Sequence, residues 1–442
     1  MKKILVLGAG LVTRPHVRYL LDVSDFEVTV ASRTVSKAEE LINGHPRGIA
    51  VALNVSDEAA LENLIQQTDL AVSMLPYVYH PVVAALCVKY KKHMVTTSYV
   101  KEEMMALDGA AREAGVILLN EIGVDPGIDH MSAVKVIHEV EGKGGKIVSF
   151  MSWTGGLPAP EAADNPFGYK FAWTPKGMLL AGKNPARFLK DGKVVEIPGE
   201  ELFDNYWTVE VQGLGEFEGY PNRDSLPYAD TYNIEPTEWM FRGTLRNPGW
   251  CATLKKMAEM GVFEDTPWNE APATFREFTA GLLDVSPDTD FPTYLAGQWA
   301  MCEDSKPITD LAWLGLFDDE PLPEGKNTPL DVIADQMAAK MEYRPGERDM
   351  IAMQHEFVAQ YPDRKEAITA TMIDFGIPYG DTSMARTVGL PAAIAVRMIL
   401  QGELADLTGV HTPVIPEIYN PVLAELAEMG ISLTETVEIL DG

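Results

Sequence analysis

The sequence predicts an α/β protein whose first part is a doubly wound parallel sheet. Three observations lead to this prediction. An apolar run at residues 4–7 leads directly into a glycine turn, GAG at 8–10. Strand-like and helix-like runs then alternate over roughly the first 120 residues, with no internal repeat. This order is typical of a parallel sheet covered by helices on both faces.

The first strand and its turn are typical of a dinucleotide-binding fold. Gly8 permits a tight turn, and Gly10 lets backbone amides approach a pyrophosphate with no Cβ in the way. Pro15 suits the first turn of the following helix, where its missing N–H costs nothing. Thr13 stands where the usual G-x-G-x-x-G pattern has its third glycine, so the prediction of a Rossmann-type fold depends on the rest of the alternation.

The remaining elements follow in chain order. Strands are expected at 26–31, 48–55, 70–75, 94–98 and 116–120, and helices at 36–42, 57–67 with Ser56 as N-cap, 81–90 and 101–114. A turn-rich segment at 121–130 then follows a strand, which is where open α/β sheets bind ligands. Beyond it we expect a helix at 131–140, a β-rich region at 146–211, a helical stretch at about 247–360 and a helix at 390–401.

The end of the second strand favours NADP(H) over NAD(H). The segment ASRT at 31–34 has no carboxylate that would repel a 2′-phosphate. Arg33 offers a planar guanidinium group, Ser32 and Thr34 offer hydroxyl groups, and Lys37 adds a positive charge from the next helix. The alternative is that Arg33 is an ordinary solvated loop residue.

Composition excludes nucleic-acid binding. The 442 residues contain 36 Lys and Arg against 65 Asp and Glu, which gives a formal net charge of −29. Binding to phosphate backbones requires clustered cations, which such a chain lacks. An anionic cofactor or substrate is also repelled at long range, so it must be captured by local cations.

Cysteine and histidine usage excludes a metal site. Cys87, Cys251 and Cys302 are widely separated, and the eight histidines show no zinc-ligand spacing. The sequence shows no signal peptide and no uninterrupted apolar run of the ~18 residues that a bilayer requires. We therefore expect a cytoplasmic protein with no metal and no membrane partner.

Eight short blocks together resemble the saccharopine reductase family, the glutamate-forming saccharopine dehydrogenases. The blocks are GAGLVTRP at 8–15, ASRT at 31–34, TSYV at 97–100, GVDPGIDH at 123–130, GGLPAPE at 155–161, GYKFAW at 168–173, YPNRDS at 220–225 and RGTLR at 242–246. They occur in family order and cover most of the chain. The resemblance implies a homodimer with an NADP-binding Rossmann domain at 1–125, a mixed α/β substrate and dimerisation domain at 126–380 that contains a helical insertion at about 247–360, and a C-terminal segment at 381–442 that returns to the first domain.

The resemblance also implies an activity and its site residues. The activity is the NADP(H)-dependent interconversion of saccharopine with L-glutamate and 2-aminoadipate 6-semialdehyde, a reaction of lysine metabolism. The residues implied to bind the cofactor are Gly8, Gly10, Leu11, Val12, Thr13, Ser32, Arg33, Thr34, Asn54, Val55, Leu75, Pro76, Tyr77, Ser98, Val124 and Pro126. The residues implied to bind the amino-acid substrate are Ser98, Tyr99, Asp125, Trp173, Arg223, Thr244 and Arg246.

Arg223 and Arg246 are suited to bind the carboxylates of saccharopine. Saccharopine carries three carboxylates, so its site needs guanidinium groups that can form bidentate pairs. Arg223 and Arg246 each lie in a turn-rich run, where a side chain can project from a rigid scaffold. The alternative for each is an ordinary surface ion pair.

Proton transfer has two candidates. Asp125 can pair with a substrate ammonium group, and Tyr99 follows the fifth strand at the ligand edge. These two residues are the nearest candidates for the general acid or base during imine formation and reduction. The alternatives are that Asp125 forms a turn and that Tyr99 is a packing residue. Trp173 can likewise be an aromatic residue of the core and not a substrate contact. Thr154 stands where fungal members have Cys, and its hydroxyl does not titrate near neutrality, so a mechanism that needs a thiol there is in doubt.

Two other functions remain open from the sequence. A reductive condensation of a diamine with an aldehyde, as in carboxynorspermidine synthase, would keep the fold but requires an acidic pocket in place of Arg223 and Arg246. A nonenzymatic NADP-sensing protein would keep the glycine turn but has no need of the other blocks.

Overall fold

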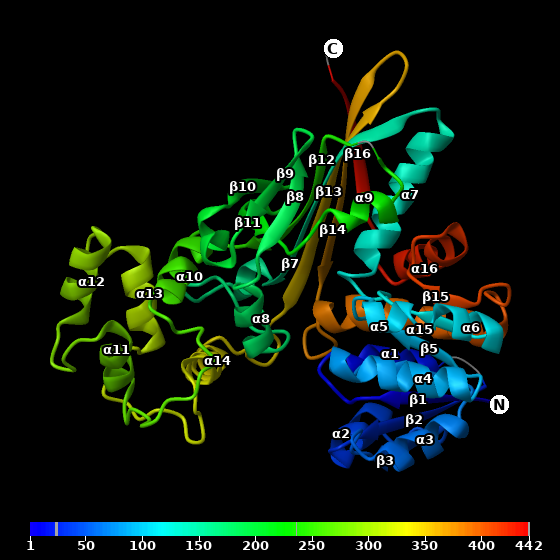
Figure 1. Cartoon of the computed structure of the whole chain (residues 1–442), viewed down its shortest axis with the longest axis horizontal. Coiled ribbons are helices and arrows are strands. Elements are labelled where there is room, and N and C mark those ends of the chain that lie inside the picture. The colour runs from blue at the N-terminus through cyan, green and yellow to red at the C-terminus, as the bar shows by residue number, and fades with distance from the viewer. Residues whose placement is uncertain (23–24, 236, 441–442) are drawn as a thin grey trace. The chain divides into compact units, whose positions relative to one another are not determined.

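The chain divides into two compact units (Figure 1). The first comprises Met1–Lys146, Tyr361–Asp363 and Met372–Glu435, and the second comprises Ile147–Gln360, Arg364–Thr371 and the residues from Thr436 on. The computed structural model describes residues 1–22, 25–235 and 237–440. The first unit continues past residue 125, where the sequence places the domain boundary, and most of the last strand, from Thr436 on, belongs to the second unit.

The first unit is built on a seven-stranded parallel sheet. Its strands are β1 (Lys2–Leu7), β2 (Phe26–Ser32), β3 (Gly48–Ala52), β4 (Leu70–Ser73), β5 (His93–Thr96), β6 (Ile117–Leu119) and β15 (Gly409–His411). The order is β15-β6-β5-β4-β1-β2-β3, and every neighbouring pair is parallel. The order reverses between β1 and β4, and doubly wound sheets bind ligands at such a switch point. The predicted Rossmann-type sheet is confirmed.

Helices surround this sheet. They are α1 (Thr13–Asp22), α2 (Val35–Ile42), α3 (Glu58–Gln66), η1 (Tyr77–Tyr79), α4 (His80–Lys89), α5 (Glu102–Met105), α6 (Asp108–Ala114), α7 (Ile128–Gly142), α15 (Ser383–Gln401) and α16 (Pro416–Glu428). The sheet buries Leu5 and Leu7 against Leu61 and Ile65 of α3 and Val83 of α4. Each such side chain contributes about 1.5–3 kcal/mol when it leaves water.

The C-terminal helices complete the first unit. α15 packs on α1 and α16, and α16 packs on α7, so the blue and orange-to-red parts of the chain lie together (Figure 1). Among the helices in the described ranges, α15 alone has the length and mean hydropathy, 1.3, of a membrane span. Because 78% of that window is buried inside the protein, α15 is accounted for as the core helix of this unit.

The second unit contains a nine-stranded mixed sheet. Its strands are β7 (Lys146–Pro158), β8 (Ala186–Lys190), β9 (Lys193–Ile197), β10 (Trp207–Val211), β11 (Gly215–Pro221), β12 (Trp239–Arg246), β13 (Asp349–Gln360), β14 (Lys365–Phe375) and β16 (Thr434–Leu440). The order is β10-β11-β12-β7-β13-β14-β16, with β8 on β12 and β9 on β8. β12 runs parallel to β7 and antiparallel to β11, so the sheet is mixed.

The helices of the second unit lie mostly in one insertion. They are η2 (Pro160–Ala162), α8 (Pro175–Ala181), η3 (Gly199–Asp204), α9 (Pro227–Thr231), α10 (Trp250–Glu259), α11 (Phe275–Leu283), α12 (Phe291–Trp299), α13 (Lys306–Leu314) and α14 (Pro329–Lys340). In Figure 1 the yellow-green helices α11 to α14 form a cluster of their own. This cluster corresponds to the helical insertion that the sequence predicts.

Three details of the predicted elements are wrong. Asp57, not Ser56, caps α3, because its carboxylate accepts a hydrogen bond from the Ala60 N–H at 3.1 Å. The helix expected at 101–114 is broken into α5 and α6, and Asp108 at the break accepts a bond from the Val410 N–H of β15. The helical stretch ends with α14, and 349–360 form β13, because an apolar run rich in Met and Ala does not by itself distinguish a buried strand from a helix.

Candidate active site

A pocket of about 590 Å³ lies at the carboxyl ends of β1 to β4. Gly8 has a φ of +111° there, and a Cβ at this residue would lie 2.9 Å from the carbonyl oxygen of Met74. A side chain therefore cannot be added without moving the neighbouring strand end. The glycine turn is a close approach of two backbones beside the pocket, as a bound dinucleotide requires.

Thr13 replaces the third glycine of the usual motif without opening the turn. It is buried, it is the first residue of α1, and its hydroxyl accepts a hydrogen bond from the Gly10 N–H at 3.1 Å. Pro15 follows as the third helical residue. The positive end of the α1 dipole thus lies beside the glycine turn, where it favours a phosphate group.

The pocket carries two cations where the cofactor ribose is expected. Arg33 and Lys37 line it and are exposed, and neither forms an ion pair with any carboxylate in the described ranges. Ser32 and Thr34 lie beside them on the same wall. Since guanidinium and ammonium groups without partners are suited to a phosphate, these residues fit the 2′-phosphate of NADP(H).

Most of the residues predicted to bind the cofactor are gathered in this pocket. Its wall contains Gly8, Gly10, Ser32, Arg33, Thr34, Asn54, Val55, Leu75 and Pro76 of the predicted set, together with Ala9, Lys37, Leu53, Ser56, Met74 and Tyr79. The predicted residues outside its wall are Leu11, Val12, Thr13, Tyr77, Ser98, Val124 and Pro126. Tyr77 is half exposed, with the Lys101 ammonium 3.7 Å from the centre of its ring.

The two candidates for proton transfer are in contact. The Tyr99 hydroxyl donates a hydrogen bond to Asp125 Oδ1 at 3.0 Å. Asp125 is half buried between the buried residues Val124 and Pro126, and its peptide bond to Pro126 is cis. At Gly127 a Cβ would lie 2.1 Å from the Gly123 carbonyl oxygen, so the loop that carries Asp125 closes tightly on itself.

Sequence reasoning missed a buried hydrogen-bonded contact that joins these two segments. Glu121 has a φ of +58°, and its carboxylate accepts a hydrogen bond from the Val100 N–H at 2.8 Å. Its other oxygen lies 2.7 Å from His130 Nε2 at the start of α7. The contact joins the Tyr99 segment to the Asp125 segment. The only signal for it in the sequence is the place of Glu121 directly after a predicted strand.

Sequence reasoning also missed His80, the first residue of α4. It is buried and lies between the hydroxyl groups of Ser73 and Ser98, 2.8 Å from each. Burial lowers the pKa of His80 to about 4, so its imidazole is neutral at physiological pH. No motif marked this residue, because its partners lie at the ends of two different strands, β4 and β5.

In the second unit, Arg246 is a buried cation. It is 5% exposed, and its guanidinium carbon lies 4.9 Å from the centre of the Tyr169 ring and 5.4 Å from that of Trp250. Nη1 donates to the Leu245 carbonyl oxygen at 2.7 Å, while Nε has no hydrogen-bond partner among the described residues. No carboxylate in the described ranges pairs with this guanidinium group, so it is suited to an anionic ligand.

Polar groups from two strands surround Arg246. Thr244 lies two residues before Arg246 on β12 and is opposite Thr154 of β7. The side chains of Thr154, Thr244 and Arg246 therefore share one face of the sheet. Thr154 Oγ1 is buried and has no hydrogen-bond partner within the described ranges. Trp173 Nε1 donates to the Tyr169 hydroxyl at 3.2 Å, which connects Trp173 to the aromatic ring beside Arg246.

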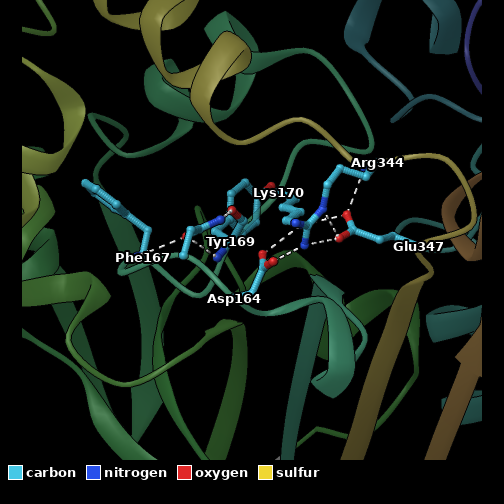
Figure 2. A network of polar contacts seen from close by, with 7 residues as sticks. Asp164, Phe167, Tyr169, Lys170, Arg344 and Glu347 are labelled. Carbon is cyan, nitrogen blue, oxygen red and sulfur yellow. Dashed lines mark hydrogen bonds and ion pairs between the residues drawn. The ribbon is translucent and has the colours of Figure 1, made fainter.

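An ionic network holds the segment that carries Tyr169 (Figure 2). Lys170 is 4% exposed, and its Nζ lies 2.9 Å from Asp164 Oδ1 and 2.6 Å from Glu347 Oε2. Arg344 also contacts both carboxylates. The hydrogen bond from Lys170 holds the pKa of Asp164 below its usual range. The network therefore ties residues 164–170 to residues 344–347, on the two sides of the helical insertion.

The structure does not bring the two predicted arginines to one point. Pro221 pairs with Gly243, so Arg223 lies close to the level of residue 241, five residues before Arg246 along β12. At about 3.4 Å per residue the two backbones are roughly 17 Å apart along the strands. Arg223 is exposed and has a φ of +56°. Such a spacing suits an elongated ligand with anionic groups at both ends.

Among the described residues, no group of three or more His, Cys, Asp or Glu side chains is arranged to hold a metal ion.

Comparison with known proteins assigns the chain to a family. Residues 4–119 match the saccharopine dehydrogenase NADP binding domain, and residues 123–431 match the saccharopine dehydrogenase C-terminal domain. A Schizosaccharomyces pombe protein named saccharopine dehydrogenase [NADP(+), L-glutamate-forming] is 42% identical, with all of both chains covered. The Saccharomyces cerevisiae protein of the same name is 38% identical over 98% of this chain and 99% of its own.

A larger relative and a solved structure agree with this assignment. The mitochondrial alpha-aminoadipic semialdehyde synthase of Bos taurus is 36% identical over 98% of this chain, which covers 47% of that protein. The apo structure of saccharopine dehydrogenase (L-Glu forming) from Saccharomyces cerevisiae matches with a TM-score of 0.91, covering 99% of this chain and all of that chain. The chain belongs to the saccharopine dehydrogenase family.

Proposed function

We propose that this chain is an NADP-dependent saccharopine dehydrogenase of the L-glutamate-forming type. The observation that carries the proposal is the 42% identity, over all of both chains, to a relative whose name states that activity. The reaction converts saccharopine, NADP⁺ and water to L-glutamate, 2-aminoadipate 6-semialdehyde, NADPH and a proton. The geometry of each unit supports a part of it.

The cofactor site supports the choice of NADP(H). When bound, NADP(H) exchanges a hydride with the substrate carbon. Gly8 allows the backbone to approach the pyrophosphate, and Arg33 and Lys37 bind the 2′-phosphate. These residues therefore give both affinity and selectivity against NAD(H), which lacks the 2′-phosphate.

Arg246 supports an anionic substrate. A buried guanidinium group without a carboxylate partner is costly unless a ligand supplies the negative charge. We assign one substrate carboxylate to Arg246, with Thr244 beside it, and a second carboxylate to Arg223. Saccharopine is elongated and has carboxylates at both ends, which agrees with the distance between these two arginines along β12.

The pair of Tyr99 and Asp125 supports orientation of the reacting amine. Asp125 accepts a hydrogen bond from the Tyr99 hydroxyl group, and this bond holds the two side chains in a fixed relative orientation. The negative charge of the Asp125 carboxylate complements a substrate ammonium group. We therefore assign both residues to the nitrogen of the substrate, where protons must move as the imine forms and is hydrolysed.

A diamine substrate fits less well. An ammonium group of a polyamine would be repelled by the buried Arg246, whose charge no carboxylate in the described ranges neutralises.

We further propose a cytoplasmic homodimer that binds neither nucleic acid nor membrane. The acidic net charge of −29 supports the absence of nucleic acid. β16 ends the strand order of the large sheet and exposes Val437 by 58% and Ile439 by 66%, and an edge strand with exposed apolar side chains favours pairing with a second copy. Light scattering on the purified chain tests this proposal, and a monomer mass would contradict it.

Absorbance of NADPH tests the activity. The purified chain is mixed with saccharopine and either NADP⁺ or NAD⁺, and in the reverse direction the semialdehyde and NADPH are mixed with glutamate or with a diamine. We expect reduction of NADP⁺ that depends on saccharopine, a much slower reaction with NAD⁺ and no reaction with the diamine. Turnover with diamines alone would overturn the proposal.

A further inference from the structure

A line of hydrogen-bonding groups lies directly behind Ser98. His80 is 3% exposed, and its two ring nitrogens contact hydroxyl groups on either side. Nδ1 lies 2.8 Å from Ser73 Oγ at the end of β4, and Nε2 lies 2.8 Å from Ser98 Oγ after β5. Nε2 is also 3.3 Å from Thr96 Oγ1. All of these residues belong to the first unit.

Thr96 decides which nitrogen of His80 carries the proton. The Thr96 hydroxyl donates its single proton to the Ser73 carbonyl oxygen at 2.9 Å. Toward His80 its oxygen can therefore only accept, so the hydrogen must be on Nε2. With the opposite tautomer, the lone pairs of Nε2 and Thr96 Oγ1 would face each other. Nδ1 is then the acceptor, and it receives the proton of Ser73.

The tautomer determines the direction of the Ser98 hydrogen bond. Because His80 Nε2–H donates to Ser98 Oγ, the hydroxyl proton of Ser98 is not used by His80. No acceptor for that proton is present within the described ranges. The backbone of Ser98 is held on both sides, since its N–H donates to Thr96 Oγ1 at 3.4 Å and its carbonyl accepts from the Glu121 N–H at 3.2 Å.

We propose that His80 is a positioning residue that makes Ser98 an oriented hydrogen-bond donor toward an oxygen of the bound ligand. The inference rests on the proposed function, in which Ser98 contacts cofactor and substrate. The ligand atom is an acceptor oxygen, which is either a substrate carboxylate oxygen or the carboxamide oxygen of the nicotinamide. His80 itself does not touch the ligand, and it acts only through Ser98.

The burial of His80 agrees with a positioning role and not with acid–base work. Burial lowers the pKa of its imidazole to about 4, so the ring keeps one N–H and one lone pair over the working range of the enzyme. A ring that does not change protonation keeps the Ser98 hydroxyl in one orientation. Fixed donors of this kind lower the cost of ordering a site when the ligand binds.

Two conservative substitutions of His80 distinguish the role of Nε2 from that of Nδ1. In His80→Gln the side-chain amide nitrogen reaches the place of Nε2, whereas in His80→Asn the amide reaches only the place of Nδ1. We expect His80→Asn to lower kcat/KM for saccharopine about tenfold, the factor that corresponds to one hydrogen bond of ~1.4 kcal/mol. We expect His80→Gln to restore most of the activity. His138→Asn, which changes a histidine of α7 bonded to the Tyr419 hydroxyl, is the matched control and should stay within twofold of the wild type.

A double-mutant cycle tests whether His80 acts through Ser98. Ser98→Ala alone should lower kcat/KM about tenfold, and adding His80→Asn to it should lower the value no further. Measuring KM for saccharopine and the dissociation constant of NADP⁺ for each variant distinguishes the two ligand oxygens, because the ligand that loses the hydrogen bond binds more weakly. Effects that multiply to about a hundredfold would overturn the inference, as would a His80→Gln variant as impaired as His80→Asn.

Nitrogen-15 NMR of the histidine-labelled protein reads the tautomer directly. The His80 signals are those that disappear in the His80→Gln variant, and their chemical shifts should show the proton on Nε2. They should not change between pH 8 and pH 6, because pH 6 still lies about two units above the pKa of His80. A proton on Nδ1 would overturn the inference even if the kinetics agreed. Absence of saccharopine turnover in the wild type would instead overturn the proposed function, and the inference that rests on it.

Discussion

Replacement of Arg246 by methionine should separate binding of the substrate from stability of the fold. The change removes a guanidinium group that is 5% exposed and has no carboxylate partner among the described residues, while a flexible apolar side chain of similar length fills its place. A substrate carboxylate bound to this group makes a charged hydrogen bond, which contributes about 1.5–3 kcal/mol. We therefore expect kcat/KM for saccharopine to fall about 10- to 150-fold.

The free energy of unfolding should change little. Replacing a buried ion pair by apolar groups of similar volume is often neutral or stabilises a protein by about 1–4 kcal/mol, and an unpaired buried guanidinium group has still less to offset its desolvation. The substitution also removes the stacking of the guanidinium group on Tyr169 and Trp250, each contact contributing about 0.5–2 kcal/mol, and the bond to the Leu245 carbonyl. The two effects oppose each other, so the net change should lie within about 2 kcal/mol of zero.

Three measurements on the same preparation test this prediction. They are the rate of NADPH formation against saccharopine concentration, the dissociation constant of NADP⁺ from fluorescence, and the midpoint of urea unfolding. The affinity for NADP⁺ should be unchanged. Arg276→Met is the matched control, because Arg276 is an arginine of α11 that pairs with Asp319, and it should leave kcat/KM within twofold. Wild-type kinetics in Arg246→Met would show that this guanidinium group binds no substrate, and a large loss of stability would show that its role is structural.

Three further predictions concern the cofactor, the second arginine and pH. Arg33→Ala should raise the KM for NADP⁺ about tenfold or more and leave the slow reaction with NAD⁺ unchanged, because only NADP⁺ carries the 2′-phosphate. Initial rates with each cofactor test this, and equal losses with both cofactors would contradict it. Arg223→Ala should raise the KM for saccharopine while NADP⁺ binds as before in a fluorescence titration, and a weakened affinity for NADP⁺ would count against its assignment to the substrate. Burial lowers the pKa of the fully buried His16 from 6.5 to about 4, so unfolding takes up a proton below pH 6.5 and the free energy of unfolding should fall by about 2 kcal/mol between pH 7 and pH 4.5. His16→Asn keeps a donor for the Gly389 carbonyl oxygen but cannot titrate, so its free energy of unfolding in urea should fall less between the two pH values. An equal fall in the wild type and the variant would contradict the cause assigned here.

The Rossmann-type sheet and its cofactor could be predicted from local sequence. Strand and helix periodicities, Gly8 and Gly10 in the turn, and the absence of a carboxylate at 31–34 each depend on residues close together in the chain. The same holds for the pocket wall, because the carboxyl ends of parallel strands meet at one edge. Where prediction failed, the sequence allowed two local structures. At the start of α3 two neighbouring residues could serve as the N-cap, and at 349–360 an apolar run could form a strand or a helix.

The buried polar contacts of the site could not be predicted in this way. His80 contacts a hydroxyl group at the end of β4 and another just after β5, and Glu121 contacts His130 of α7. Arg246 stacks on Tyr169, a residue 77 positions earlier in the chain. Their partners depend on strand order and on distances of a few ångström between distant segments. Hydrogen bonds and ion pairs act only at such short range, so the local pattern of the chain could select the fold and the nucleotide, whereas the orientation of each donor toward the substrate emerged only when the strands were in place.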